Sequence, residues 1–297
     1  MSASRTKWNR EAKEFYLFIS PWLIGFIALT IGPMIFSIGL SFMRWDIITE
    51  PIWVGLSNYR EMFFADDVFL QSLKVTTIYT IVVVPLHLLA SLAVAMLLNQ
   101  KVKAIGTWRT IFYLPSLLPA VAASMLFLFI FFKEGLLNSL VVAVGLPPQS
   151  WLQDEQFALV SLMAMSFWGF GAQMLIFLAG LQNIPQELYE ASDIDGAGRW
   201  SKFAHVTVPS LSPVVFFNLV MAIIGTFQVF TQGFLITNGG PNNATMFYVL
   251  YLYKNAFEYF RMGYASAMAW VLFIIIMGCT AFVFKSSQAW VHYEGSK

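Results

Sequence analysis

Six long apolar segments, each free of charged side chains, constrain the fold of this chain more than any other feature of its sequence. A transmembrane helix needs about 20 apolar residues, since each residue adds about 1.5 Å along the axis. Within hydrocarbon every backbone polar group must be paired inside the protein, and a β-barrel would alternate polar with apolar residues, so we expect helices. The sequence therefore predicts an all-α polytopic membrane protein with six transmembrane helices. They cover approximately residues 15–42, 75–98, 111–132, 157–181, 213–236 and 264–284.

The composition supports a membrane protein and argues against several other classes. Only 11% of the 297 residues are charged and 58% are hydrophobic, whereas soluble domains carry about 25% charged residues. A net charge of +1 gives no reason to expect nucleic-acid binding. The one cysteine, Cys279, excludes a disulfide framework, and no metal-ligand spacing is evident. Basic residues precede the first apolar run without a small-residue cleavage site after it, which predicts a retained first span.

Lysine and arginine are unevenly divided between the two sides of the predicted bundle. If both termini lie on one side, that side holds eleven basic residues and the opposite side holds six. Because cytoplasmic loops carry the excess of Lys and Arg, we expect both termini to be cytoplasmic. The eleven are Arg5, Lys7, Arg10, Lys13, Lys101, Lys103, Arg109, Arg199, Lys202, Lys285 and Lys297, and the six are Arg44, Arg60, Lys74, Lys133, Lys254 and Arg261.

A polar, glycine-punctuated loop lies between the fourth and fifth spans, on the predicted cytoplasmic side. Pro185 suits the first turn of a short helix, and Gly196 can end that helix in a left-handed conformation. A second short amphipathic piece is expected from Arg199 to near Pro209. We interpret this loop as a docking surface for a soluble partner. The alternative is an ordinary interfacial loop with its helix on the lipid headgroups. The predicted apolar stripe of the first helix comprises Ile184, Leu188, Ala191 and Ile194.

The chain carries no evident energy source of its own. Ion-coupled carriers need ionisable side chains at membrane depth, and only His87 lies within a predicted span. We favour a neutral His87 bonded to a backbone carbonyl freed by Pro85 over a ligand or sensor role. The sequence has no Gly-Lys pair and hence no P-loop. It also shows no nucleophile beside a base, so we expect no enzyme activity and no ATPase site.

The polar loop resembles the EAA loop of the permease subunits of bacterial ABC importers. That family pattern is Glu-Ala-Ala, two residues, Asp-Gly-Ala, about eight residues, then Ile-x-Leu-Pro. Here the chain reads Glu-Ala-Ser at 190–192, Asp-Gly-Ala at 195–197 and Val-Thr-Val-Pro at 206–209. Ser192, Val206 and Val208 are conservative departures. The resemblance implies contact with a separate cytoplasmic ATPase through Glu190, Ala191, Ser192, Asp195, Gly196, Ala197, Arg199 and Pro209.

A second resemblance follows the fifth span. Residues 237–245, Thr-Asn-Gly-Gly-Pro-Asn-Asn-Ala-Thr, are similar to an external loop of carbohydrate importer permeases, the group that carries maltose, other oligosaccharides and glycerol phosphate. Residues 246–260 are similar to that group's external amphipathic helix. Its apolar positions are expected at 246, 249, 250, 253, 257 and 260, with Lys254, Asn255 and Glu258 on other faces.

The resemblance covers essentially the whole chain and implies the type I ABC importer permease (MetI-like) fold. It implies cytoplasmic tails at 1–14 and 286–297 around a permease domain at 15–285, with a coupling loop at 182–212 and the external loop and helix at 237–263. It also implies an inner-membrane location, a second and usually different permease subunit, two ABC ATPase subunits and an extracytoplasmic solute-binding protein. ATP and Mg²⁺ would bind the ATPase subunits, and this chain would bind no cofactor.

A sugar requires hydrogen-bonding groups and flat aromatic faces within a cavity. Aligned on the loop, the family's sugar-contacting positions fall in the fourth and fifth spans. The alternative is that these polar groups only tie helices together, or that the partner subunit alone contacts the sugar. The expected residues are Trp168, Gly169, Gln173, Asn218, Thr226 and Gln228.

The sequence thus predicts the permease subunit of an ATP-driven ABC importer for a sugar or oligosaccharide. One alternative is the same machine for another solute, such as glycerol phosphate, phosphate or an amino acid, which the uncharged spans and the loop at 238–245 disfavour. The other is a passive channel or a membrane anchor for a soluble enzyme complex. That alternative leaves the spacing from Glu190 to Pro209 unexplained.

Overall fold

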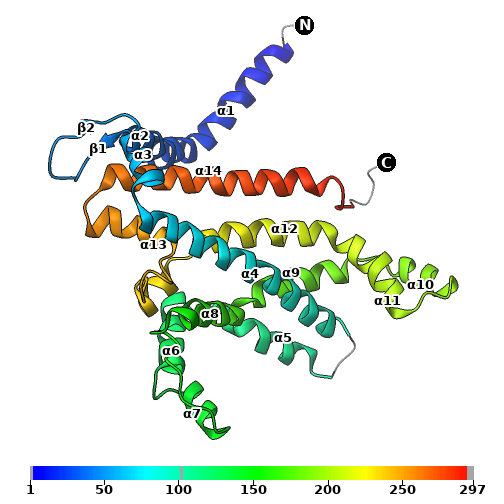
Figure 1. The fold of residues 1–297 in the computed structure, drawn as a ribbon. Helices are drawn as coiled ribbons and strands as arrows, with labels where there is room; N and C mark the ends of the chain where they lie inside the picture. Colours follow the sequence, from blue (N-terminus) through cyan, green and yellow to red (C-terminus); the bar gives the residue numbers. More distant parts are fainter. Residues whose placement is uncertain (1–2, 101–102, 293–297) are drawn as a thin grey trace. The chain divides into compact units, whose positions relative to one another are not determined.

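The computed structural model describes residues 3–100 and 103–292, which are mostly helical (Figure 1). Within this described part, five helices are long and apolar enough to cross a membrane, and a sixth span is formed if one bent helix pair is counted as one. The six-helix prediction is therefore confirmed. The predicted tails fall partly outside the described residues, as do Lys101 and Lys297 of the counted basic residues. The five helices are Glu11–Ser41, Asp67–Leu98, Ala120–Ala143, Arg199–Phe227 and Met262–Ser287, and the bent pair is Glu155–Gly169 with Gly171–Gln182.

The chain divides into two compact units, one made of residues 1–65 and 254–271 and the other of 66–253 and 272–297. In the first unit β1 pairs antiparallel with β2, and Asn58 Nδ2 donates to Ser41 O at 2.8 Å and to Met43 O at 2.9 Å. Arg261 Nη2 donates to Glu61 Oε1 at 2.6 Å. The elements of this unit are α1 (Ala3–Phe26), the π-turn η1 (Ile27–Ile31), α2 (Gly32–Ser41), β1 (Met43–Arg44), β2 (Ile52–Trp53), α3 (Ser57–Phe64), η6 (Lys254–Glu258) and the start of α14 (Met262–Ser287).

The second unit is built around α4. This helix begins after Asp66, whose carboxylate accepts from Phe69 N at 2.9 Å, and it continues through Pro85. Helices α9 and α12 pack against it. The elements in chain order are α4 (Asp67–Leu98), α5 (Ile105–Tyr113), η2 (Leu114–Leu117), α6 (Ala120–Phe131), α7 (Leu136–Ala143), α8 (Glu155–Ser166), η3 (Phe167–Gly169), α9 (Gly171–Gln182), α10 (Gln186–Ile194), α11 (Arg199–Lys202), η4 (Phe203–Thr207), α12 (Val208–Phe227), η5 (Gly233–Thr237), α13 (Tyr248–Tyr253) and the end of α14.

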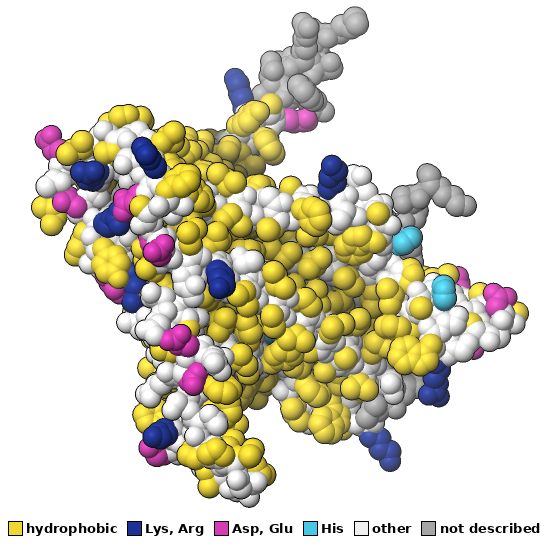
Figure 2. Space-filling view, in the orientation of Figure 1, with side chains coloured by type: hydrophobic (Ala, Val, Ile, Leu, Met, Phe, Trp, Pro, Cys, Tyr) yellow, Lys and Arg dark blue, Asp and Glu magenta, His cyan; other side chains and the backbone are white. Residues whose placement is uncertain are grey.

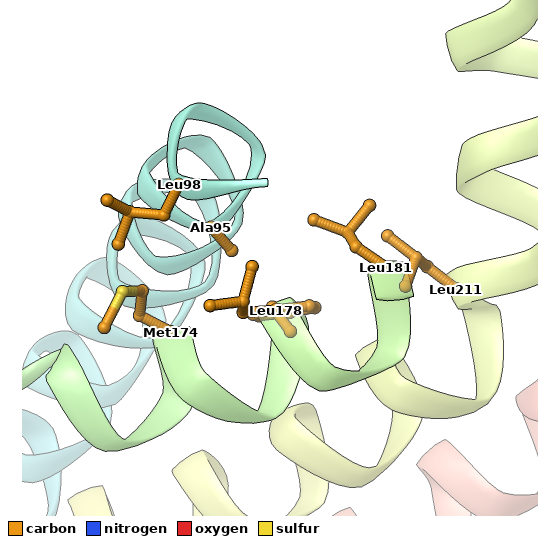
Figure 3. Packing of buried hydrophobic residues seen from close by; sticks show 7 residues of the cluster. Ala95, Leu98, Met174, Leu178, Leu181 and Leu211 are labelled. Carbon is orange, nitrogen blue, oxygen red and sulfur yellow. The ribbon is translucent and has the colours of Figure 1, made fainter. Parts of the chain in front are cut away.

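A buried cluster joins three of these helices near the ends of α4 and α9. Met174 and Leu178 of α9 lie close to the end of α4, and Leu181 of α9 lies beside Leu211 of α12 (Figure 3). Lipid tails are as apolar as these side chains, so the cluster stabilises the fold through close van der Waals packing more than through exclusion of water. The cluster therefore holds the ends of α9 and α12, between which the polar loop is inserted. Its members are Ala95, Leu98, Met174, Phe177, Leu178, Leu181 and Leu211.

The predicted third span, 111–132, is displaced along the chain. Helix α5 ends at Tyr113, a 3₁₀ turn follows, and α6 begins only at Ala120, so the apolar stretch long enough to cross is Ala120–Ala143. Pro115 and Pro119 lie in the interruption. Proline lacks a backbone donor and disfavours helical geometry at the residue before it, which accounts for the break.

The fourth and fifth spans also differ from expectation. The fourth contains a 45° bend between Gly169 and Gly171. The sequence predicts the fifth span at 213–236, but its helix covers Arg199–Phe227, with Gln228 as the C-cap. Pro209 does not end the preceding piece, because it lies in the first turn of α12, where its missing N–H is not needed.

The predicted amphipathic helix at 246–260 is only partly correct. Tyr248–Tyr253 is helical and Lys254–Glu258 forms a π-turn. Met246 and Leu250 are buried as expected, but Lys254 and Asn255 are buried too, whereas Phe257 and Phe260 are exposed. The π-turn shifts the helical phase, so a stripe drawn at 3.6 residues per turn fails in its second half.

Candidate functional site

The polar loop forms a tip beyond the ends of α9 and α12, built from α10 and α11 (Figure 1). No residue of α10 is buried. In Figure 2 charged side chains gather at this tip, whereas the helices leading to it are covered with hydrophobic side chains. A helix that contributes nothing to the core is available for contact with another molecule.

Gly196 ends α10 in the left-handed conformation, as predicted, with φ of 73°. Gly196 N donates to Asp193 O at 3.0 Å, and Ala197 N donates to Ser192 O at 2.9 Å. This pair of bonds defines a Schellman motif, in which a left-handed residue satisfies the last carbonyls of the helix. The turn directs the chain from α10 into α11.

Two polar contacts join α10 to the segment that follows it. Tyr189 Oη and Thr207 Oγ1 are 3.0 Å apart, and Lys202 Nζ pairs with the Asp193 carboxylate. We call these two contacts the brace. Sequence reasoning did not identify it, because the partners are separated by 18 and 9 positions and meet only through the turn at Gly196. The segment carrying Thr207 continues without a break into α12, so the brace connects α10 directly to a transmembrane helix.

The tip exposes three large apolar side chains. The exposed fractions are 42% for Leu188, 88% for Ile194 and 83% for Trp200. Ile184, the first position of the predicted stripe, packs instead against the buried cluster. The stripe therefore does not face one environment, since its start joins the core and its end projects outward. Exposed apolar groups rimmed by charges are typical of protein interaction sites.

The structure gathers all eight predicted coupling residues in this loop. Glu190 Oε1 accepts from Gln186 Nε2 at 3.0 Å, and Ser192 Oγ donates to Tyr189 O at 2.8 Å. Their side-chain contacts with an ATPase are untested and stay a prediction. Along the chain, Glu190, Ala191 and Ser192 lie on α10, Asp195 is its C-cap, Gly196 and Ala197 form the turn, Arg199 begins α11, and Pro209 lies in the first turn of α12.

Two of the six predicted sugar residues share a pocket of about 250 Å³. Trp168 and Gly169 line it together with Gln232, which lies after the end of α12. The Trp168 ring lies edge-on to Phe127, with ring centroids 5.0 Å apart. We call this cavity the inner pocket. No charged side chain of the described chain lines it.

The other four predicted sugar residues do not line the inner pocket. Asn218 Nδ2 donates to Val214 O at 3.1 Å and Thr226 Oγ1 to Ala222 O at 2.8 Å, so both polar groups are used within α12. Gln228 is an exposed C-cap, and Gln173 Oε1 is buried without a hydrogen-bond partner among the described residues. In this structure the four residues do not lie in the inner pocket with Trp168, and their contact with a sugar stays a prediction.

His87 differs from its predicted arrangement. The backbone that hydrogen-bonds to its ring belongs to Ser166 of α8, not to the turn before Pro85. The ring is also edge-on to Phe167 at 5.6 Å, and its Nε2 has no partner within the described chain. His87 thus joins α4 to the bend between α8 and α9.

The sequence and fold match a family of transport proteins. A family model described as "Binding-protein-dependent transport system inner membrane component" matches residues 87–292. The chain is 46% identical over 286 residues to the probable ABC transporter permease protein YesP of Bacillus subtilis, covering 95% of this chain and 93% of that protein. It is 36% identical to the arabinooligosaccharides transport system permease protein AraP of B. subtilis (88% and 84% covered) and 36% identical to the lactose transport system permease protein LacF of Rhizobium radiobacter (88% and 89% covered).

The fold is similar to that of a solved transporter chain. A crystal structure of a bacterial ABC transporter that imports the acidic polysaccharide alginate contains a chain that matches with a TM-score of 0.81. The match covers 96% of this chain and 99% of that chain at 21% identity. At this identity the likeness concerns the fold, which is the predicted MetI-like permease fold.

Proposed function

We infer the function from one premise, that the chain belongs to the family of binding-protein-dependent transport system inner membrane components. We propose that it is the permease subunit of an ATP-driven importer that moves a sugar or oligosaccharide across the bacterial inner membrane. A separate cytoplasmic ATPase would supply the energy, and an extracytoplasmic binding protein would deliver the sugar. Both termini would be cytoplasmic.

The exposed tip built from α10 and α11 is the observation that carries this proposal. Helix α10 has no buried residue, presents Leu188 and Ile194 outward, and is joined to α12 by the brace. A partner that grips α10 can therefore move a transmembrane helix without disturbing the core. In this proposal ATP and Mg²⁺ bind the partner ATPase, and binding energy shifts the permease between outward-facing and inward-facing states.

The inner pocket supports a neutral, carbohydrate-like solute. Its lining combines the aromatic faces of Trp168 and Phe127 with the amide of Gln232 and the hydroxyls of Ser116 and Ser166. Amides and hydroxyls hydrogen-bond sugar hydroxyls, and aromatic faces contact the C–H surface of a sugar ring. An amino acid or a phosphate ester would need a charged partner, which the lining lacks. Relatives named for arabinooligosaccharides and lactose agree with this class.

Reconstitution of the full transporter tests the proposal. The permease would be co-purified with its partner permease, ATPase and binding protein and placed in proteoliposomes. We expect ATP-dependent uptake of at least one of radiolabelled arabinotriose, lactose, trehalose and maltotriose, and none of glycerol phosphate or glutamine. Uptake of solute by the isolated chain without nucleotide would contradict ATP coupling. ATP-dependent uptake of glycerol phosphate or glutamine alone would contradict the sugar assignment.

A further inference from the structure

A second cavity follows the inner pocket along the same two segments. It has a volume of about 540 Å³, and we call it the outer pocket. On α6, residues 120–127 contribute to the inner pocket and Leu128 and Phe131 to the outer one. On the segment after α12, Gln232 belongs to the inner pocket and residues from Ile236 to Pro241 to the outer one. A shift of four residues along a helix is about 6 Å, so the two cavities occupy successive levels along both segments.

Aromatic rings connect the two levels. Trp168 of the inner pocket contacts Phe127 at 5.0 Å, and Phe127 contacts Phe131 at 5.7 Å between ring centroids. Phe131 and Trp151 both line the outer pocket. A sugar ring presents C–H groups to such aromatic faces. The rings of Trp168, Phe127 and Phe131 can therefore contact a sugar one after another as it moves between the two pockets.

One wall of the outer pocket is fixed by a buried asparagine. Asn138 is only 2% exposed, and its Nδ2 donates to Lys133 O at 2.9 Å and to Gln149 O at 2.8 Å. Its Oδ1 accepts from Gln149 N and from Trp151 Nε1, each at 2.9 Å. Ser161 Oγ adds a bond to Trp151 O at 3.1 Å. The indole of Trp151 is therefore held in place before any ligand arrives, which lowers the entropy lost on binding.

Another part of the lining comes from the segment of residues 236–241. Thr245 Oγ1 lies 2.7 Å from Thr237 Oγ1 and donates to Gly240 O at 2.6 Å. Asn242 hydrogen-bonds the Glu155 carboxylate at the start of α8. These contacts hold the segment in place, and Lys133, Glu134 and Gln153 also line the cavity. Neither charged side chain forms an ion pair with another described residue.

We propose that the outer pocket is a separate saccharide site, which holds a glycosyl unit before it reaches the inner pocket. Trp151 provides the stacking face, and Gln153, Glu134 and Lys133 hydrogen-bond the hydroxyls. The volume falls within the range of about 300–1,000 Å³ usual for small-ligand sites. This inference rests on the proposed function, because it assumes that the transported solute is a sugar.

Protection of a single cysteine tests occupancy directly. In the complete complex with Cys279→Ser, Gln153→Cys places the only cysteine of this chain at the outer pocket. Glu50→Cys, at an exposed position between β1 and β2, is a control outside both pockets and outside the membrane spans. The probe is the saccharide among arabinotriose, lactose, trehalose and maltotriose that gives the highest wild-type uptake. We expect it to slow maleimide labelling of Gln153→Cys about tenfold and to leave labelling of Glu50→Cys unchanged, whereas a sugar that the wild-type complex does not take up should have no effect.

Uptake kinetics distinguish a stacking role of Trp151 from a purely structural role. We expect Trp151→Ala to raise KM about tenfold with kcat nearly unchanged, and Trp151→Phe, which keeps a ring, to stay within about threefold of wild type. Trp53→Ala is the matched control, since Trp53 is an exposed tryptophan of β2 that lines neither pocket. Ligand protection of Gln153→Cys remains measurable even if Trp151→Ala does not fold.

The outcomes distinguish this inference from the function on which it rests. Absence of protection at Gln153→Cys, or an equal KM defect in Trp151→Ala and Trp151→Phe, would overturn the outer site while wild-type sugar uptake persists. Failure of every saccharide to be taken up by the wild-type complex would instead remove the proposed function itself, and the outer site with it.

Discussion

At the scale of single residues, Gly196 directs the chain at the tip, because its left-handed backbone ends α10 and leads into α11. Gly196 follows an amphipathic stretch, and a helix that stops there needs a residue tolerant of positive φ, so its conformation could be inferred from its neighbours in sequence. The roles of Asn218 and Thr226 depend on rotamers. Both side chains bond to their own helix, a choice that sequence spacing does not reveal.

Replacing Gly196 tests the left-handed turn. Gly196→Leu forces a side chain into the conformation with φ of 73°, which costs about 1–2 kcal/mol and favours a different exit from α10. Because α10 has no buried residue, we expect normal insertion, retained ATPase activity and at least about tenfold lower uptake per ATP hydrolysed. Proteoliposomes with paired uptake and ATPase assays measure this ratio.

Gly198→Ala is the matched control for that substitution. Gly198 has φ of −70°, and an added Cβ meets no atom within 4 Å, so alanine fits there without strain. Wild-type uptake per ATP in Gly196→Leu would argue that the turn does not transmit work. A comparable loss in Gly198→Ala would show that the loop tolerates no change at all, whatever the sign of φ.

At the scale of elements, the hydrophobic pattern predicted that helices exist but not where each one breaks. Three prolines illustrate the difficulty. Pro85 is accommodated inside α4, whereas Pro115 and Pro119 lie where α5 and α6 separate. A proline within an apolar run can kink or end a helix, and neighbouring helices decide which outcome is stable. The brace was missed for a similar reason, because it depends on a turn that brings distant residues together.

The Tyr189–Thr207 contact of the brace, which joins α10 to η4, is predicted to transmit motion. Removing one hydroxyl with Tyr189→Phe or Thr207→Val deletes a hydrogen bond worth about 1 kcal/mol, which corresponds to roughly a fivefold change. We expect uptake per ATP to fall by about that factor in each single variant and no further in the double variant, since both remove the same bond. The double-mutant cycle on reconstituted transporter measures this.

A distant tyrosine supplies the control for the brace. Tyr59 Oη donates to Ser41 Oγ at 2.8 Å in the other unit, so Tyr59→Phe removes one hydroxyl bond of the same kind without touching the coupling loop. We expect it to leave uptake per ATP unchanged. Additive losses in Tyr189→Phe and Thr207→Val would mean that the two side chains act independently. An unchanged ratio would eliminate the Tyr189–Thr207 contact as a transmitter of motion.

At the scale of the whole molecule, counting predicted a polytopic helical protein with both termini on one side, and the resemblance of the loops predicted the particular fold. Six uncharged spans and the excess of basic residues on one side require no knowledge of packing, because the bilayer itself selects for them. The fold of the solved importer chain agrees with that reading. The placement of cavities was beyond reach, since a cavity depends on how several helices bend together. Trp168 and Gly169 were expected to contact a sugar, and both line the inner pocket.

The orientation of the chain in the membrane is open to a direct test. In a Cys279→Ser background, Gln186→Cys lies at an exposed position of α10 and Glu50→Cys at an exposed position between β1 and β2, outside the membrane spans. With eleven basic residues against six, we expect an impermeant maleimide to label Glu50→Cys in right-side-out vesicles and Gln186→Cys only in inverted ones. The reverse pattern would overturn the assignment of both termini to the cytoplasm.

The absence of buried residues from α10 has an evolutionary consequence. Core residues are constrained by folding, so a change there is filtered first for stability and only then for activity. Substitutions in a helix without buried residues have little effect on folding stability. Selection on them acts mainly through recognition of the partner. The permease can thus diverge toward a different motor, or come to share one motor with other permeases, while its membrane bundle stays as it is.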